Sequence, residues 1–237
     1  MYEVTVVVSS YDRLDLLKTT LESFLKFNTK PVKKIIIFED SAKDTMRIGI
    51  LNLIKELNVP SIELCFNEKN LGFLKNYDKS MQTADTEFIF RIEDDYLFLA
   101  PGFIEKSLEL MTADPNIFQV HIRLPKELEQ QHRCEDTIYS TPNGLKYKKL
   151  LKAYGGPGGP GTGPWDGISS NAGLRRKSHY NLLAPYSSFA VEEAAINVAY
   201  RIFPNFYSVL LYDNMNGYCT HIGEGRSAVF RGVGGNR

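Results

Sequence analysis

Short apolar runs alternate with helix-periodic segments through the N-terminal part of the chain, and this alternation limits the possible folds more than any other feature. The runs, which are nearly all apolar, occupy residues 4–8, 34–38, 61–66 and 87–92. Apolar side chains recur at helical spacing in the segments between them, residues 13–27, 48–57 and 71–81. Strands that are apolar on both faces are typical of a parallel sheet that helices cover on both sides. The pattern therefore predicts an α/β fold with a mostly parallel central sheet.

The second half of the chain is less regular. We expect a helix that starts at Pro101 and a strand over residues 117–122, whereas residues 124–150 fit no clear element. The other predicted elements are two helices and one strand, at residues 174–183, 190–201 and 206–212 respectively. No internal repeat or linker divides the chain, so all 237 residues are expected to form a single domain.

Residues 155–167, GGPGGPGTGPWDG, contain too much glycine and proline for a helix or a strand. A loop of this length suits either a lid over a binding site or a plain surface excursion. It carries Trp165, the only tryptophan of the chain, followed by Asp166. Because an indole ring can stack on a ligand, we expect this end of the loop to contact one.

Charge and cysteine content exclude several classes of protein. The 28 basic and 28 acidic residues cancel, so no overall attraction to nucleic acid or to a membrane surface is expected. Cys65, Cys134 and Cys219 are far apart and odd in number, which favours a reducing compartment over a disulfide framework or a zinc site. The N-terminus has no signal-peptide pattern and no apolar run is long enough to span a membrane, so we expect a soluble cytoplasmic protein.

Polar residues follow each of the four predicted strands at its carboxyl end. They are Ser9, Ser10, Tyr11, Asp12 and Arg13, then Glu39 and Asp40, then Asn67 and Asn70, and finally Glu93, Asp94 and Asp95. Each cluster alone is compatible with a solvated loop. Because parallel strands end at one edge of a sheet and ligands bind there, the four clusters together predict a binding site.

The acidic triplet within FRIEDDYLFLAPGF, residues 90–103, is the most distinctive of these clusters. Adjacent carboxylates repel one another, and a divalent cation such as Mg²⁺ or Mn²⁺ would offset that repulsion. Side chains alternate along a strand, so Glu93 and Asp95 are expected to share one face while Asp94 points elsewhere. A solvated turn is the alternative, and the position of the triplet after a buried strand favours the metal site.

Four motifs in order resemble those of the GT-A fold glycosyltransferases of family 2, which use nucleotide sugars. VTVVVSSYDR resembles the opening strand and loop of that family, and IIIFEDSAKD its second strand and nucleotide-binding turn. NEKNLGFLKNYDKSM is similar to its Asn-Leu-Gly segment, and RIEDDYLFLAPGF to its DxD-type metal motif, with Glu93 in place of the usual first aspartate. The resemblance implies a GT-A fold in which residues 1–100 bind the donor and residues 101–237 face the acceptor.

The resemblance also implies a role for each matching residue. The donor-binding residues would be Ser9, Tyr11, Arg13, Asp40, Asn70, Lys75, Asn76, Glu93 and Asp94. Asp95 would be the principal ligand of Mn²⁺ or Mg²⁺, and Asn171 would contact the transferred sugar. Trp165 and Asp166 would then lie on the acceptor side.

A later carboxylate usually serves as the general base in this family. VEEAAINVAYR, residues 191–201, offers Glu192 and Glu193 at the start of a predicted helix. A base there would take a proton from the acceptor hydroxyl during direct displacement with inversion, and by position we favour Glu193. The alternative is that both acids only complement the helix dipole.

One histidine has a context that suggests a function. His221, in CTHIGEGR, resembles the late histidine that completes the metal site in GT-A enzymes. In the same segment, Arg226 would reach the oxygens of a diphosphate. His121, His132 and His179 lack such a context and are expected to be structural or on the surface.

Together these motifs predict a metal-dependent glycosyltransferase that uses a UDP-, GDP- or dTDP-linked sugar and an unknown hydroxyl acceptor. A sugar-nucleotide pyrophosphorylase is one alternative, but it would need a glycine-rich loop where this chain has SSYDR. A non-catalytic carbohydrate-binding or scaffolding protein is the other alternative. The intact acidic triplet and Glu193 argue against it.

Overall fold

The computed structural model describes residues 2–152, 165–188 and 193–226 of the chain. In its N-terminal part, strands and helices alternate. The strands are β1 (Val4–Ser10), β2 (Lys34–Glu39), β3 (Ile62–Phe66) and β4 (Phe88–Glu93). The helices between them are α1 (Leu14–Phe27), α2 (Asp44–Leu57) and α3 (Phe73–Thr83). The four strands and three helices predicted for this region are therefore confirmed, nearly at their predicted bounds.

The later elements of the described chain are mostly shorter. The strands are β5 (Tyr96–Phe98), β6 (Ile117–His121), β7 (Tyr139–Ser140), β8 (Lys146–Lys149), β9 (Gly173–Arg176), β10 (Tyr207–Leu211) and β11 (Cys219–His221). The helices are α4 (Phe103–Ala113), α5 (Pro125–Gln131), α6 (Lys177–Asn181), the 3₁₀ helix η1 (Tyr186–Ser188) and α7 (Glu193–Tyr200). Residues 124–150, which the sequence pattern left unassigned, contain α5, β7 and β8.

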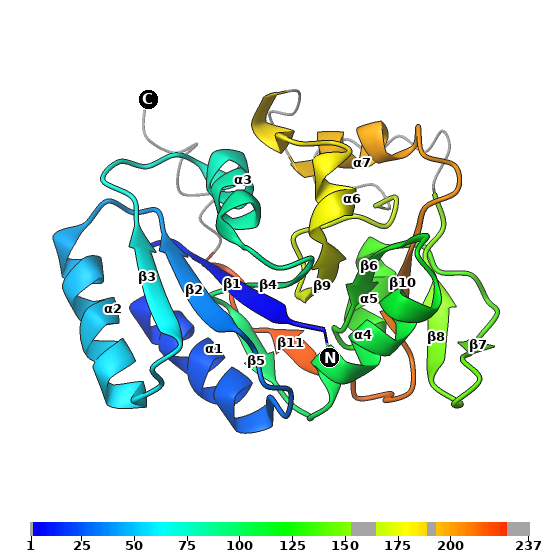
Figure 1. The fold of residues 1–237 in the computed structure, drawn as a ribbon, viewed down its shortest axis with the longest axis horizontal. Coiled ribbons are helices and arrows are strands. Elements are labelled where there is room, and N and C mark those ends of the chain that lie inside the picture. Colours follow the sequence, from blue (N-terminus) through cyan, green and yellow to red (C-terminus); the bar gives the residue numbers. More distant parts are fainter. Residues whose placement is uncertain (1, 153–164, 189–192, 227–237) are drawn as a thin grey trace.

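Nine of these strands form one sheet, in the order β3-β2-β1-β4-β9-β6-β10-β8-β7 (Figure 1). The first four are parallel to one another, and β6 is parallel to β10. β9 lies between β4 and β6 and is antiparallel to both. A second sheet pairs β5 with β11. The predicted α/β fold with a mostly parallel central sheet is confirmed.

Residues 174–183 do not form one helix, so that prediction is wrong for its first part. The segment begins within β9, and only α6 is helical. A Cβ atom on Gly173 would lie 2.0 Å from the carbonyl oxygen of Val120, so β9 approaches β6 as closely as a glycine allows. Leu174 is fully buried between the neighbouring strands. Pairing on both edges overrides the local helical spacing.

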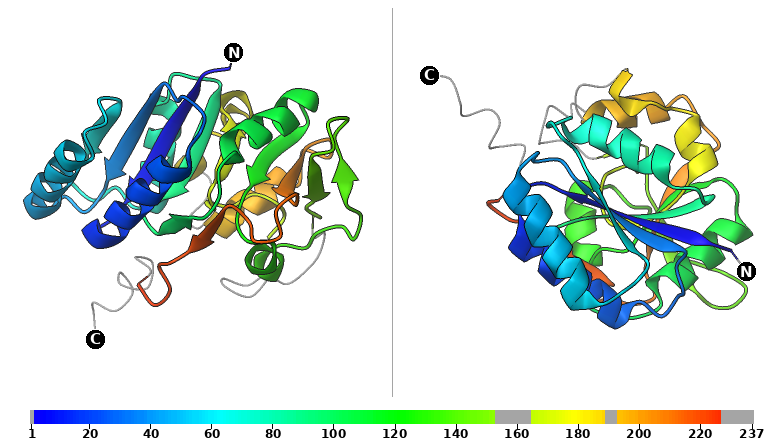
Figure 2. Two further views of the ribbon diagram at one scale, coloured as in Figure 1. Left: turned by 90° about the horizontal axis from the view of Figure 1, so that it is seen from below. Right: turned by 60° about the vertical axis from the view of Figure 1, so that its left-hand side comes forward.

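Helices cover both faces of the sheet (Figure 2). One core layer joins Val6 and Val8 of β1 to apolar residues of α1, α2 and α4. The other layer joins Val7 of β1 to residues of α3, α6 and α7. Because successive side chains of a strand point to opposite faces, one apolar run supplies both layers. None of the helices in the described ranges has both the length and the apolar character needed to cross a membrane.

Candidate active site

The carboxyl ends of β1, β2 and β4 lie side by side. In the parallel register, Ser9 pairs with Phe38 of β2 and with Glu93 of β4, and Ser10 pairs with Glu39. The polar residues that follow these strands therefore meet at one edge of the sheet, where the sequence predicts a binding site.

Arg13 joins the loop after β1 to the acidic triplet. Its Nη1 atom lies 2.8 Å from Oδ2 of Asp95. Its Nε atom lies 3.3 Å from Oδ2 of Asp94, and Nη2 contacts the other oxygen of that carboxylate. The backbone N–H of Tyr11 also donates to Asp94, at 3.1 Å. Burial raises the pKa of Asp94 to about 7, against the effect of Arg13. One guanidinium thus contacts two buried carboxylates.

The acidic triplet turns away from β4 instead of extending it. Glu93 is the last residue of β4, and Asp94 and Asp95 form a turn before β5 begins. The alternation expected for a continuing strand is therefore wrong. Asp94 and Asp95 share Arg13, whereas the carboxylate of Glu93 lies 3.5 Å from Nη2 of Arg91.

His221 reaches Asp95 from the last strand of the described chain. β11 pairs antiparallel with β5, and Nε2 of His221 lies 3.2 Å from Oδ2 of Asp95. This hydrogen bond raises the pKa of His221. Burial acts to raise the pKa of Asp95, but His221 and Arg13 hold it below its ordinary value. A Cβ atom on Gly223 would lie 2.4 Å from Oδ2 of Asp95, so the chain passes this carboxylate at a glycine.

Asp95 and His221 fit a divalent cation. Oδ1 of Asp95 is buried and accepts no hydrogen bond from the described residues. A carboxylate oxygen and an imidazole nitrogen are suitable ligands for Mn²⁺, and Mg²⁺ prefers oxygen. Within the described ranges, no group of three or more His, Cys, Asp or Glu side chains could hold a metal ion. The other ligands would be substrate phosphate oxygens and water, as is usual for Mg²⁺ sites.

Asp40 connects the loops after β2 and β3. Its Oδ1 atom accepts hydrogen bonds from Nδ2 of Asn67 and from the N–H of Leu71, both at 2.8 Å. Its Oδ2 atom accepts one from the N–H of Gly72 at 3.0 Å. Asn67 Nδ2 also donates to Oδ1 of Asn76, at 2.9 Å. Burial raises the pKa of Asp40. The predicted donor-binding residues Asp40 and Asn76 thus belong to one buried hydrogen-bond network.

The other predicted residues at this edge are Ser9, Tyr11 and Asn70. The side-chain amide of Asn70, which is exposed, lies 3.3 Å from the hydroxyl of half-buried Tyr11. The hydroxyl of Ser9 accepts a hydrogen bond from Nη2 of Arg91 at 3.1 Å. Asn70 is therefore the most accessible side chain of the group, and Ser9 and Tyr11 are half-buried.

Sequence reasoning missed Arg91, which lies under the site in β4. Its side chain is fully buried, and its guanidinium lies 4.3 Å from the ring centroid of Tyr77 on α3. It donates to the carbonyl oxygen of Ser170 at 2.7 Å as well as to Ser9. The sequence signal that could have identified Arg91 is a charged residue inside an apolar strand, because a buried charge needs partners.

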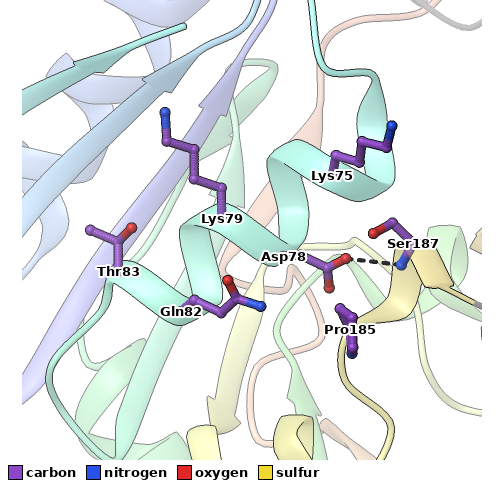
Figure 3. A pocket seen from close by; sticks show the side chains of 7 residues that line it. All are labelled: Lys75, Asp78, Lys79, Gln82, Thr83, Pro185 and Ser187. Carbon is purple, nitrogen blue, oxygen red and sulfur yellow. Dashed lines mark hydrogen bonds between the residues drawn. The ribbon is translucent and has the colours of Figure 1, made fainter.

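Lys75 lies in a cleft between α3 and η1 (Figure 3). The cleft has a volume of about 400 Å³ and is lined by Lys75, Asp78, Lys79, Gln82, Thr83, Pro185 and Ser187. Asp78 accepts a hydrogen bond from the N–H of Ser187 at 2.9 Å, which ties the two walls together. Lys79 donates to Oδ1 of Asn67, so the cleft adjoins the network around Asp40.

Asn171 lies just before β9, and its side chain is surrounded by protein partners. Its Oδ1 atom accepts from the Tyr96 hydroxyl at 2.9 Å and from Nη1 of Arg123 at 3.0 Å. Its Nδ2 atom donates to Oε1 of Gln131 at 3.0 Å. Asn171 therefore contacts the residue that follows the acidic triplet, and its predicted contact with a sugar stays a prediction.

Three further predicted ligand contacts have protein neighbours. Arg226 donates to both oxygens of Asp15 in α1, at 2.6 and 3.0 Å. Asp166 is buried and accepts from Nε of Arg201 at 2.6 Å. Trp165 is half-buried, with its ring centroid 6.3 Å from that of His132. Residues 155–164 of the glycine-rich segment lie outside the described ranges.

One of the two candidate bases lies in α7. This helix is described from Glu193 onward, and Glu192 lies outside the described residues. Glu193 is therefore helical, as predicted, and its role as the base stays a prediction.

A family model described as "Glycosyl transferase family 2" matches residues 5–183, which is most of the chain. The chain belongs to this family, as the motif resemblance indicates. The matched range includes the four strand ends and the acidic triplet.

Two curated relatives are the β-1,4 N-acetylgalactosaminyltransferases 1 of Mus musculus and Rattus norvegicus, which are 22% and 23% identical to this chain over 194 residues. Each match covers 82% of this chain and 30% of the relative, so the chain spans less than a third of their length.

Solved structures share the fold at low sequence identity. The mannosyltransferase PcManGT of Pyrobaculum calidifontis, in complex with GDP-Man and Mn²⁺, has a TM-score of 0.62 and 12% identity, covering 95% of this chain and 58% of that one. GalNAc-T7 with UDP, GalNAc and Mn²⁺ has a TM-score of 0.60 and 12% identity, covering 93% and 44%. S. aureus TarS has a TM-score of 0.55 and 14% identity, covering 92% and 36%. The predicted GT-A fold is confirmed.

Proposed function

We propose that this chain is a metal-dependent glycosyltransferase that moves a sugar from a nucleoside-diphosphate sugar to an acceptor hydroxyl. Membership of glycosyl transferase family 2 supports the class of reaction. The observation that carries the proposal is the pairing of Asp95 with His221, 3.2 Å apart, beside the ends of β1 and β4. Oδ1 of Asp95, which is buried and has no hydrogen-bond partner among the residues that the structure describes, is suited to a cation.

In this proposal, Asp95 and His221 would hold Mn²⁺ or Mg²⁺, which would supply positive charge beside the diphosphate leaving group. Arg13 keeps the carboxylates of Asp94 and Asp95 in place through its contacts with both. The exposed side chain of Asn70 and the half-buried side chain of Tyr11 line the approach to the nucleotide. These roles assign binding and orientation to the N-terminal part of the chain.

Glu193 is our candidate for the general base. Its place in the family motif, on the helix α7, supports the role. A base on the acceptor side would remove the hydroxyl proton as the oxygen attacks the anomeric carbon. We propose direct displacement with inversion, and NMR analysis that found the anomeric configuration retained in the product would contradict it.

The donor class follows from the relatives and stays a proposal for this chain. The names of two structural neighbours pair GDP-Man or UDP and GalNAc with Mn²⁺, and the curated relatives are N-acetylgalactosaminyltransferases. We therefore expect a UDP-, GDP- or dTDP-sugar, with UDP-linked N-acetylgalactosamine the first to test. The acceptor is a hydroxyl compound.

A thermal-shift screen of UDP-, GDP- and dTDP-sugars, each with and without Mn²⁺, tests the proposal. A donor that binds only the folded chain raises the melting temperature by mass action. We expect Asp95→Asn to abolish the Mn²⁺-dependent part of the shift. The control is Asp85→Asn, which removes a carboxylate paired with Lys33 at 3.1 Å. Asp85 lies before β4, whereas Asp95 follows that strand. A Mn²⁺-dependent shift that persists in Asp95→Asn would remove the metal assignment. The absence of any shift with every donor would favour a scaffolding protein.

A further inference from the structure

The strand that carries His221 is short and depends on contacts from both sides. β11 has three residues; it pairs with β5 on one edge and forms a single bridge, from Cys219 to Arg123, on the other. On its other side, the N–H of Leu124 donates to the carbonyl oxygen of Cys219 at 3.0 Å. The residues between β6 and α5 therefore form the second support of β11.

A partly buried ion pair lies at this second support. Nη2 and Nε of Arg123 lie 2.9 and 3.3 Å from Oε2 of Glu127, the third residue of α5. Oε1 of Glu127 accepts a hydrogen bond from the hydroxyl of Thr220. The N–H of His221 lies 3.5 Å from Oε2 of Glu127. Glu127 thus contacts two consecutive residues of β11.

The same guanidinium reaches the loop before β9. Nη1 of Arg123 lies 3.0 Å from Oδ1 of Asn171 and 3.3 Å from Oε1 of Gln131. The hydroxyl of Tyr96 donates to the same oxygen of Asn171, at 2.9 Å. Tyr96 follows Asp95 directly, and its ring packs edge-on against His221 with centroids 5.8 Å apart. The network therefore contacts both Tyr96, the residue after Asp95, and the strand that carries His221.

We infer that Arg123 and Glu127 are positioning residues that hold His221 against Asp95 and tie both to Asn171. This inference rests on the proposed function, because it assigns the pair to the proposed metal site. Neither side chain is placed on the substrate. The pair acts by fixing the strand that carries His221 and the side chain that flanks Asp95.

The burial of Arg123 argues against an incidental pairing with Glu127. Arg123 is 6% exposed, and a charge removed from water is retained only where partners satisfy it. The guanidinium contacts three side chains from two segments, which are Glu127 and Gln131 of α5 and Asn171 before β9. Partners that orient metal ligands in this way typically contribute about 10- to 100-fold to metal affinity.

The test measures Mn²⁺ affinity directly, by the electron paramagnetic resonance signal of free Mn²⁺ in the presence of UDP. We expect Glu127→Gln to weaken Mn²⁺ binding by roughly 10-fold. The matched control is Glu129→Gln on the same helix, which removes the partner of Lys148 at 2.9 Å. This control is expected to bind Mn²⁺ like the wild type. Equal affinity in Glu127→Gln and Glu129→Gln would overturn the inference.

A double-mutant cycle shows whether Glu127 acts through His221. If it does, Glu127→Gln has little further effect on Mn²⁺ affinity once His221→Ala is in place. Independent, additive losses would contradict a positioning role. Hydrogen exchange provides a readout without metal, because Glu127→Gln is expected to reduce the protection of the amides of residues 219–222, and unchanged protection would overturn the inference.

The two proposals fail in different ways. If the wild-type chain binds no Mn²⁺ but Glu127→Gln loses protection in β11, the metal assignment fails and Glu127 remains the support of the strand. If the wild type binds Mn²⁺ and Glu127→Gln changes neither affinity nor protection, the metal site stands and the positioning role fails.

Discussion

Nη1 of Arg13 lies 2.8 Å from Oδ2 of Asp95, the same oxygen that faces Nε2 of His221 at 3.2 Å. One carboxylate oxygen is thus held between two basic groups, while Oδ1 is buried without a partner among the described residues. The arrangement fixes the orientation of Asp95 before any ligand binds. Preorganised ligands of this kind lose little entropy when a cation and a diphosphate arrive.

The first prediction concerns Arg13→Met. Asp94 is completely buried and would lose its charged partner, so we expect the free energy of unfolding to fall by about 3 kcal/mol. The loss should lie near the low end for a buried pair, because the pKa of Asp94, at about 7, allows the carboxyl to take up a proton. Urea denaturation at pH 7 measures the change. The control Arg226→Met removes an exposed partner of Asp15 and should have little effect. Equal stability of the two variants would contradict this account of Arg13.

The second prediction concerns Gly223→Ala. The new Cβ atom would lie 2.4 Å from Oδ2 of Asp95 and 2.9 Å from its Cβ atom, so the carboxylate must move. We expect the Mn²⁺-dependent thermal shift to disappear, with a loss of stability of about 1–3 kcal/mol from overpacking. Glu224→Ala, one residue further along the exposed part of the segment, is the control and should keep the shift. A normal metal response in Gly223→Ala would mean that Asp95 is not the ligand.

The strands and the edge where they end could be predicted from sequence, because buried parallel strands leave apolar runs and parallel register aligns their ends. β1 and β4 are in register from Val4 opposite Phe88 to Ser9 opposite Glu93, which brings the two polar clusters together. Local pattern was sufficient here, since each strand is apolar along nearly its whole length.

The rest of the site depends on pairings between distant segments, which local pattern does not encode. Helical spacing over residues 174–183 was a misleading signal, because β9 is held between two strands. No sequence motif identified Arg91 or Arg123, because their partners lie up to 82 residues away in the chain. The acidic run alone does not predict the turn at Asp94, because Arg13 binds this carboxylate from another loop.

The third prediction concerns pH and the three buried histidines, which were expected to be structural or on the surface. Burial lowers the pKa of His179 to about 4 and that of His132 to about 3, and holds the pKa of His121 well below its ordinary value. All three are therefore neutral in the folded chain at pH values where the unfolded chain is protonated.

At these three histidines the unfolded chain binds more protons than the folded chain below about pH 6.5, so their contribution to the free energy of unfolding falls as pH decreases toward 4. Burial raises the pKa of Asp94 to about 7, and this carboxyl acts in the opposite direction over the same window. The slope from each histidine approaches about 1.4 kcal/mol per pH unit only near pH 5, where that histidine is almost fully protonated in the unfolded chain. His179 packs against Phe118 and Phe206, with ring centroids 5.4 and 4.7 Å away, so His179→Phe should keep the packing and reduce the slope. Urea denaturation between pH 5 and pH 6.5 measures it. An unchanged slope in His179→Phe would show that this residue does not titrate on unfolding.

The fourth prediction separates catalysis from helix capping at Glu193. If Glu193 is the base, Glu193→Gln should lower kcat by about 10²- to 10⁴-fold, because the acceptor hydroxyl keeps its proton during attack. Donor and Mn²⁺ binding, measured by thermal shift, should stay unchanged, since a base on the acceptor side makes no contact with the nucleotide. Glu192→Gln is the matched control and should retain most of the activity. If the acid only complements the dipole of α7, Glu193→Gln should instead lower the melting temperature slightly and leave kcat near the wild-type value. That second outcome would leave direct displacement with inversion without a base, and Glu192 would become the residue to test.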